Sequence, residues 1–146
     1  MRTAVVSGVA RPTGIGRQIA RTLLNKGYKV VGCDIAPEES PDVPQSPAYS
    51  FVKVDVRRLE DVHALRDNVE RVADGPHLNV LVNNAGIATP NLDSADPVGS
   101  WHSFIDTNLT GAFLMSHALQ PLLQPGSSAI IHISSTRALQ SEPGCE

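Results

Sequence analysis

Apolar runs and amphipathic runs alternate along the chain. Five apolar runs have the length and composition of strands, at residues 3–7, 28–34, 51–56, 78–86 and 128–135. Amphipathic runs with helical spacing lie between most of them, at residues 14–27, 59–75 and about 97–123. This alternation predicts an α/β fold with a doubly wound parallel sheet, helices on both faces and the strand order 3-2-1-4-5. A ligand crevice is then expected at the carboxyl ends of the strands.

The first helical run has one apolar and one polar side. The apolar side recurs at helical spacing and holds Ile15, Ile19, Leu23 and Leu24. The polar side, which we expect to face solvent, holds Arg17, Arg21 and Lys26. Gly27 suits the position after the helix because glycine readily adopts the left-handed conformation found there. Gly75 and Pro76 are likewise expected to end the second helical run, because neither residue favours a continuing helix.

The third helical run begins at Asp96 and Pro97, which suit the N-cap and the first helical position. It is expected to break near Asn108. Its apolar residues include Leu109, Phe113 and Leu119. They either pack on the sheet or form a partner surface in a homo-oligomer, and burial on the sheet is the more economical interpretation. Residues 36–50 hold four prolines and are predicted to be a loop, as are the last eleven residues.

Composition places the chain among ordinary globular proteins and adds few constraints. The 146 residues are 41% hydrophobic and 18% charged, with a net charge of −3 and scattered basic residues, so no nucleic-acid partner is expected. No apolar run approaches the ~18 residues of a membrane span, and we expect a cytoplasmic protein. The histidines show no metal-ligand spacing. Cys33 is expected to be a small buried side chain, without a disulfide to Cys145.

The stretch SGVARPTGIG, residues 7–16, joins the first strand to the first helix and suits a phosphate group. The N-terminus of a helix presents unpaired N–H groups and a partial positive charge. Gly8 permits a tight exit from the strand, while Gly14 and Gly16 remove Cβ atoms that would keep a diphosphate or a neighbouring strand away. A glycine cluster alone is weak evidence, because many turns contain one.

Asp34 strengthens the dinucleotide hypothesis. It ends the second strand, 18 residues after Gly16, where a carboxylate accepts hydrogen bonds from the hydroxyls of an adenosine ribose. A carboxylate repels a 2′-phosphate, so NAD is favoured over NADP. Arg11 in the glycine loop is a counter-indication, because a basic residue there could hold that phosphate. The alternative for Asp34 is a solvated residue at a strand end.

Six segments of the chain resemble the classical short-chain dehydrogenase/reductase family. They are SGVARPTGIG, Asp34, DV at 55–56, NNAG at 83–86, WHSFIDTNLTG at 101–111 and IIHISS at 130–135, in family order across essentially the whole chain. The resemblance implies a Rossmann-type fold. It also implies an NAD(P)-dependent oxidoreductase that transfers a hydride between the nicotinamide and a small-molecule secondary alcohol or carbonyl compound.

The resemblance also implies roles for individual residues. The implied cofactor contacts are Gly8, Gly14, Ile15 and Gly16 at the diphosphate, Asp34 and Ile35 at the ribose, Asp55 and Val56 at the adenine, and Asn84, Ala85 and Gly86 along the centre. Arg11 is a further candidate cofactor contact, through a 2′-phosphate. Asn83 would be mainly structural. Asn108 matches the active-site asparagine that interrupts a helix and organises a water, and Ser135 matches the serine that binds the substrate oxygen. Without the resemblance, Asn108 would be a helix-end cap and Ser135 a turn cap.

Two features depart from the family pattern. Five residues separate Gly8 from Gly14, where the family usually has three. Enoyl reductases of the same superfamily have comparable loops, but they lack NNAG and the following ISS. The family's catalytic tyrosine would fall two positions past Glu146, with a lysine four further on, so that the YxxxK motif is missing from its expected place. Tyr28 and Tyr49 lie elsewhere.

These observations leave three hypotheses about function. Residues 1–146 are expected to be a single NAD(P)-binding domain that is incomplete, the N-terminal part of an oxidoreductase that is inactive by itself. Alternatively, the chain is a non-catalytic dinucleotide-binding module that regulates or pairs with a full-length homologue. A different nucleotide-binding protein, such as a methyltransferase, would share the glycine corner, but NNAG and ISS argue against it.

Overall fold

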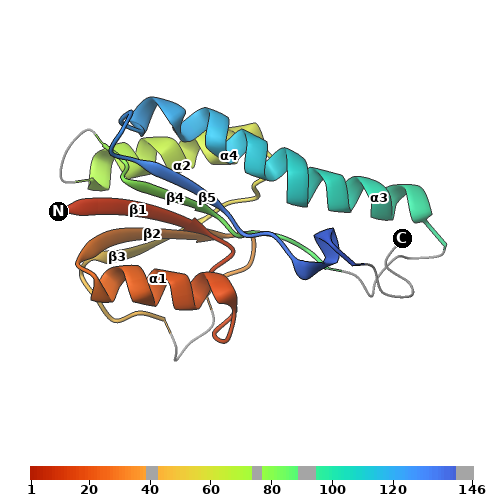
Figure 1. The fold of residues 1–146 in the computed structure, drawn as a ribbon, viewed down its shortest axis with the longest axis horizontal. Helices are drawn as coiled ribbons and strands as arrows, with labels where there is room; N and C mark the ends of the chain where they lie inside the picture. Colours follow the sequence, from red (N-terminus) through yellow and green to blue (C-terminus); the bar gives the residue numbers. More distant parts are fainter. Residues whose placement is uncertain (39–42, 74–76, 89–94, 141–146) are drawn as a thin grey trace.

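Five parallel strands form one sheet in the computed structural model, which describes residues 1–38, 43–73, 77–88 and 95–140 (Figure 1). The strands are β1 (Arg2–Ser7), β2 (Tyr28–Asp34), β3 (Tyr49–Lys53), β4 (Val80–Asn83) and β5 (Ala129–His132). Their order is β3-β2-β1-β4-β5, and every neighbouring pair is parallel. The predicted class and strand order are therefore confirmed, and all carboxyl ends lie at one edge of the sheet.

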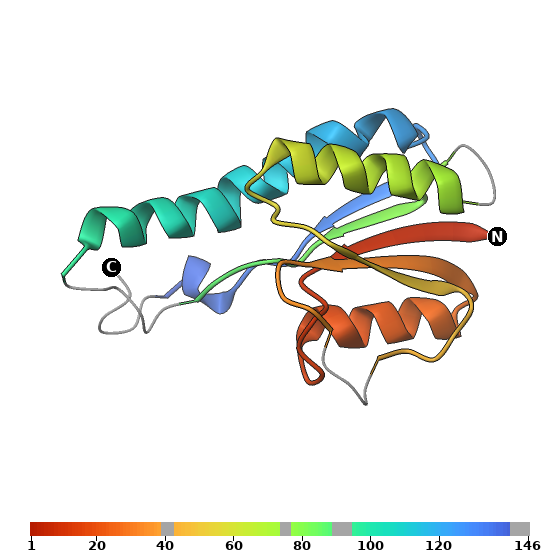
Figure 2. The ribbon, with the colours of Figure 1, turned by 180° about the vertical axis from the view of Figure 1, so that it is seen from behind.

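Helices cover both faces of this sheet. Helix α1 (Ile15–Asn25) lies on one face, and α2 (Leu59–Val72) and α4 (Gly111–Leu119) lie together on the other, as Figures 1 and 2 show from opposite sides. Helix α3 (Pro97–Ile105) continues through a π-helical turn, η1 (Asp106–Thr110), into α4, and it extends beyond the sheet. Two 3₁₀ turns, η2 (Gln120–Leu122) and η3 (Thr136–Ala138), flank β5 in the sequence.

Strand β1 shows how the two cores form. Ala4 and Val6 point to the α1 side and Val5 to the other, and all three are fully buried. Alternate residues of a strand face opposite sides of the sheet, so a strand covered on both faces is apolar throughout. The larger core lies on the side of α2 and α4 and includes Leu65, Leu81, Met115 and Leu119.

Element boundaries differ clearly from the predictions in three strands, since β5 is also shorter, at Ala129–His132 rather than 128–135. The strand predicted at 51–56 is observed at Tyr49–Lys53, because Val54 makes the last backbone bond, to Asp34, before the chain turns toward α2. The run at 78–86 forms a strand only over Val80–Asn83. Leu78 instead makes an isolated bridge with Leu123, beside the end of η2. Gly27 has a φ of +77° and ends α1 as expected.

Some predictions of burial were wrong. Arg17, expected on the solvent side of α1, is fully buried. Leu109 and Phe113 are 64% and 62% exposed and do not pack on the sheet, whereas Leu119 does. Strand β5 is an edge strand of the sheet, and its Ile130 is 40% exposed.

Two predictions concern residues that lie wholly or partly outside the described ranges. Gly75 and Pro76 lie outside the described residues, as does Cys145, and α2 is observed to end at Val72. Cys33 is buried as a free thiol. Within the described ranges, no helix has both the length and the apolar character needed to cross a membrane.

Candidate functional site

The glycine corner begins directly after β1. Gly8 has a φ of +76°, in the left-handed region that favours glycine. A Cβ atom on Gly8 would lie 2.9 Å from the Cα of Ala85, so the loop passes close to the chain that leaves β4. The backbone N–H of Gly8 donates to the carbonyl of Cys33, which ties the corner to β2 as well.

Gly16 brings the start of α1 against this corner. A Cβ atom there would lie 2.5 Å from Asn84 Nδ2 and closer still to the Gly8 carbonyl oxygen. Gly14 is the N-cap of α1, and no side chain caps the helix. The first-turn N–H groups therefore sit at the strand-to-helix corner without a side-chain cap, and this is an arrangement suited to an anion.

The end of β4 is fastened to the end of β1 by side chains. Asn84 Nδ2 donates to the carbonyls of Ser7 and Gly8, at 2.9 and 3.1 Å. The Ser7 hydroxyl oxygen accepts from the backbone N–H groups of Asn84 and Ala85, each at 3.0 Å. Ser7 was not among the predicted site residues, although its place immediately before Gly8 is a signal that could have found it.

Asp34 lies at the end of β2 beside the glycine loop. Its Oδ2 accepts from the N–H of Ala10 at 2.9 Å, and its Oδ1 accepts from the N–H of Ala36 at 3.1 Å. A carboxylate has about four lone-pair sites, so two acceptor positions remain for hydroxyl groups. The neighbouring Ile35 is 52% exposed. The corner and the acid predicted from the sequence are therefore in contact.

A hollow of about 370 Å³ lies beyond Asp34, at the same edge, and is lined by Ile35, Lys53, Asp55, Arg58, Asp61 and Ala64. Arg57 donates to the Asp55 carboxylate through Nε and Nη2, and these bonds hold the pKa of Asp55 below its usual range. Val56 is buried, with its side chain toward Gly111. Asp55 thus faces the hollow, and Val56 belongs to the core beside it.

Asn108 lies in the π-helical turn and reaches back to the chain after β4. Its Oδ1 accepts from the N–H of Ile87, and its Nδ2 donates to the carbonyl of Ile87, both at 2.9 Å. A Cβ on Gly86 would lie 3.2 Å from Asn108 Oδ1. Asn108 is therefore a clamp on the NNAG turn rather than a helix-end cap. The π turn places it there, as such turns often do at functional sites.

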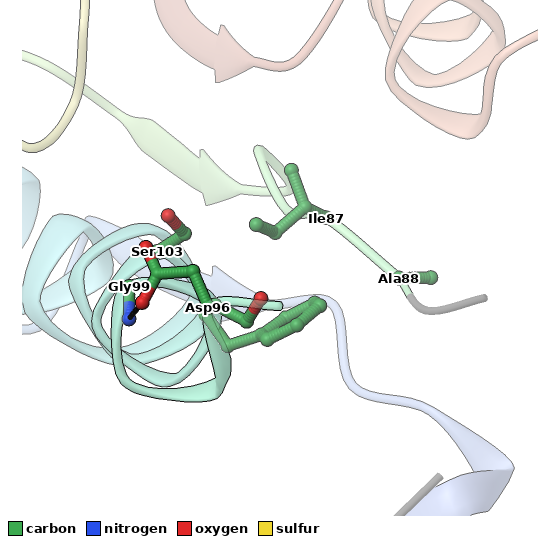
Figure 3. A pocket seen from close by; sticks show the side chains of 7 residues that line it. Ile87, Ala88, Asp96, Gly99 and Ser103 are labelled. Carbon is green, nitrogen blue, oxygen red and sulfur yellow. Dashed lines mark hydrogen bonds between the residues drawn. The ribbon is translucent and has the colours of Figure 1, made fainter. Parts of the chain in front are cut away.

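A second hollow, of about 410 Å³, opens between Ile87 and the start of α3 (Figure 3). Asp96 caps α3 by accepting from the N–H of Gly99 at 2.9 Å, as the sequence predicted. Ser103 and Ala88 lie on the walls of the same space. This hollow is lined by Ile87, which Asn108 contacts. The first hollow is lined by Ile35, which follows Asp34.

Ser135 follows β5 and is exposed. Its hydroxyl oxygen accepts from the N–H of Arg137 at 3.2 Å and caps the turn η3. This is the turn-capping role that the residue has without the family resemblance. Among the described contacts, none joins Ser135 directly to Asn108 or to the glycine corner.

The sequence contains one Tyr-x-x-x-Lys spacing, at Tyr49 and Lys53, away from the place expected after Ser135. Both residues belong to β3, where positions four apart are about 13 Å distant, rather than adjacent as on a helix. Burial and the Glu38 carboxylate raise the pKa of Tyr49, which is the opposite of what a catalytic tyrosine requires. Tyr28 lies at the start of β2, with Arg2 over its ring.

Arg17 and Glu38 form a buried ion pair that sequence analysis did not find. The Arg17 Nε donates to the carbonyl of Val9 at 2.7 Å, and its Nη2 lies 3.2 Å from the Ala10 carbonyl and 2.9 Å from Glu38 Oε1. The Tyr49 hydroxyl donates to the same Glu38 oxygen. The sequence signal that could have indicated these contacts is the position of Arg17. It directly follows Gly16, and the lengthened loop before it contains carbonyl groups that need hydrogen-bond donors.

Among residues 1–38, 43–73, 77–88 and 95–140, no group of three or more histidine, cysteine, aspartate or glutamate side chains could hold a metal ion.

Comparison with known proteins agrees with this geometry. A family model described as enoyl-(acyl carrier protein) reductase matches residues 8–146. The chain is 35% identical to a 3-alpha-(or 20-beta)-hydroxysteroid dehydrogenase of Mycobacterium bovis, over 99% of this chain and 55% of that protein. It is 39% identical to a cis-4-hydroxycyclohexanecarboxylate dehydrogenase of Sinomonas cyclohexanicum, over 92% of this chain and 55% of that protein.

A solved structure extends the comparison to the fold. Ligand-free aldohexose dehydrogenase of Thermoplasma acidophilum superposes with a TM-score of 0.81 at 28% identity, and covers 99% of this chain and 53% of its own. The chain thus spans about half the length of the proteins that it matches.

Proposed function

The chain belongs to the short-chain dehydrogenase/reductase family, and on this premise we propose that it binds NAD as the dinucleotide-binding part of an oxidoreductase. The proposed reaction transfers a hydride between the nicotinamide and a secondary alcohol or carbonyl compound. The observation that carries the proposal is the closed corner at the carboxyl edge. There Gly8 and Gly16, which lack Cβ atoms, pack against the Asn84 side chain, and Asp34 lies against the same loop.

The residues present fit a dinucleotide. Gly8 and Gly16 let the start of α1 pack directly against the loop and the chain after β4, since a Cβ atom on either would meet Asn84. The N-terminus of α1, which no side chain caps, is the proposed partner of the diphosphate. Asp34 retains acceptor capacity for ribose hydroxyls, and its charge disfavours the 2′-phosphate of NADP. Ile35 and Asp55 line a hollow that suits the adenine. Gly14, Ile15, Arg11, Ala85 and Gly86 complete the proposed cofactor set, whereas Val56, buried in the core, is left out of it.

Two residues are proposed to act on the substrate side. Asn108 fixes the turn after β4 through Ile87, and so holds the backbone next to the nicotinamide side of the site. Ser135 offers a hydroxyl at the end of β5 that would hydrogen-bond the substrate oxygen. When bound, the nicotinamide supplies the hydride, and proton transfer to or from the substrate oxygen requires a positioned acid or base.

The 146-residue chain is proposed to bind the cofactor with negligible turnover. Both of its tyrosines lie at the starts of β2 and β3, with Tyr49 bonded to Glu38, and neither is placed to exchange a proton beside Ser135. General acid–base catalysis typically contributes ~10²–10⁴-fold. Dehydrogenase activity of the purified chain at rates usual for enzymes, 1–10³ s⁻¹, would contradict this part of the proposal. The same geometry suits a non-catalytic dinucleotide-binding module.

The test of cofactor binding is titration of the chain with NADH and NADPH, followed by ligand fluorescence. We expect NADH to bind more tightly. Asp34→Ala should weaken NADH binding by about 1–3 kcal/mol, or roughly fivefold to 150-fold, the scale of a lost hydrogen bond to a charged group. Asp67→Ala, at an exposed position of α2, is the matched control. Unchanged NADH affinity in Asp34→Ala would refute the ribose assignment, and tighter binding of S-adenosylmethionine would favour a methyltransferase.

A further inference from the structure

Arg17 of α1, Glu38 and Tyr49 of β3 form a cluster of polar side chains that contacts the glycine loop. The Arg17 side chain is fully buried, and the side chain of Glu38 is 8% exposed. Taking two charges out of water costs more than their attraction usually returns, so a buried ion pair is weak evidence of stability by itself. The contacts of this pair point instead to a role in fixing the loop above it.

The cluster and Asp34 hold the two ends of one peptide group. The carbonyl of the Val9–Ala10 peptide accepts from Arg17 Nε at 2.7 Å. The N–H of the same peptide donates to Asp34 Oδ2 at 2.9 Å. Any rotation of this peptide would break both bonds together. The direction of the Asp34 carboxylate therefore depends on where Arg17 holds the loop.

The position of Arg17 is fixed in turn by Glu38 and by Tyr49 of β3. Glu38 balances its charge, and the Tyr49 hydroxyl donates to Glu38. Tyr49 reaches Glu38 across Gly32, where a Cβ atom would lie 2.5 Å from the Tyr49 hydroxyl oxygen. The glycine in β2 thus leaves room for the phenol. A tyrosine is protonated at neutral pH, and the raised pKa of Tyr49 keeps it a donor at higher pH as well.

We propose that Arg17, Glu38 and Tyr49 are positioning residues that set the Asp34 carboxylate for the adenosine ribose, an inference that rests on the proposed NAD binding. The cluster touches the loop, not the cofactor. Its effect on affinity passes through the Val9–Ala10 peptide and Asp34, so it should vanish when Asp34 has no carboxylate.

The test is a double-mutant cycle in the full 146-residue chain, with NADH as the ligand. Arg17→Met risks unfolding because it leaves Glu38 buried and unpaired, so Tyr49→Phe is the variant of choice: it keeps the ring and removes only the hydroxyl. We expect Tyr49→Phe to weaken NADH binding about threefold to tenfold in the wild-type background, and less than about twofold in the Asp34→Ala background. Tyr28→Phe, which changes the other tyrosine, is the matched control.

Each outcome decides the inference. Equal loss of affinity in both backgrounds would mean that Tyr49 acts through general stability, and the inference would fall. It would also fall if Tyr49→Phe bound NADH like the wild type. Either result leaves the proposed function standing as long as the Asp34→Ala effect is present. Absence of NADH binding by the wild-type chain would instead remove the proposed function and the inference together. Melting temperatures of all variants show whether they are folded.

Discussion

Replacement of Gly16 by alanine tests the closeness of the corner most directly. The added Cβ would lie 2.5 Å from Asn84 Nδ2 and closer to the Gly8 carbonyl oxygen, whereas ordinary contact begins at 3.4 Å. The obstacle is mostly backbone, because Gly8 is held by its bond to Cys33 and by its left-handed conformation. Helix α1 or the loop must therefore move by about 1 Å, the difference between these distances.

The magnitude follows from two opposing effects. Forcing a methyl group into a packed site costs about 1–3 kcal/mol. Alanine recovers up to about 1 kcal/mol over glycine in a helix, and less at the first turn. We therefore expect Gly16→Ala to lower the free energy of unfolding by about 1–2 kcal/mol. The shift also moves the first-turn amides away from the loop, so NADH affinity should fall at least about tenfold.

Urea unfolding followed by circular dichroism measures the first effect, and NADH titration the second. Gly14→Ala is the comparison, because its Cβ would lie 3.1 Å from the Arg11 carbonyl oxygen and needs a shift of only a few tenths of an ångström. Its loss of stability should be the smaller of the two. If Gly16→Ala were as stable as the wild type and bound NADH equally well, the close approach of α1 to the corner would be disproved.

Three further predictions concern other parts of the molecule. Asn108→Ala removes both bonds to the Ile87 backbone; it should cost about 1–2 kcal/mol of unfolding free energy and speed amide exchange at Ile87. Asp96→Ala removes the cap of α3 and should cost about 1 kcal/mol, measured by thermal unfolding. Burial raises the pKa of Cys33 to about 12, and burial with Glu38 raises that of Tyr49. Unfolded groups then lose protons first, so urea unfolding should show stability falling by about 1.4 kcal/mol per pH unit for each group. The fall should begin at about pH 9 for Cys33 and at about pH 10 for Tyr49.

Conservative variants provide the controls for these predictions. Asn108→Asp keeps an acceptor for the Ile87 N–H but loses the donor, and an effect equal to that of alanine would count against the two-bond clamp. Asp96→Ser retains a capping oxygen and should be close to the wild type. Stability that stays constant from pH 7 to pH 11 would contradict the neutral state of the buried Cys33 and the half-buried Tyr49.

The sheet could be predicted from the sequence because strand and helix periods alternate clearly. The apolar runs of β1 and β2 require cover on both faces, and short connections between parallel strands leave few topologies. The corner was predictable for a similar reason, since the glycines and Asp34 lie at fixed distances from strand ends. The start of β3 was harder to predict, because Tyr49 and Ser50 directly follow a proline-rich loop and no change of pattern separates them from it.

The contacts under α1 could not be predicted from periodicity. Helical spacing places Arg17 with Arg21 on a polar face, and nothing in that pattern shows that its partner comes from Glu38 in another loop. The exposure of Leu109 and Phe113 was missed for a related reason. Phe113 and Leu119 both lie in α4 but are six residues apart, which is about 120° around a helix, so they do not share one face.

The doubly held Val9–Ala10 peptide has a consequence for the speed of ligand capture. A glycine-rich loop that samples many shapes must wait for the competent one, and each association then carries a conformational delay. Here the guanidinium and the carboxylate keep one shape before any ligand arrives. Mixing experiments should show a single association phase whose rate rises in proportion to ligand concentration, without a slower plateau.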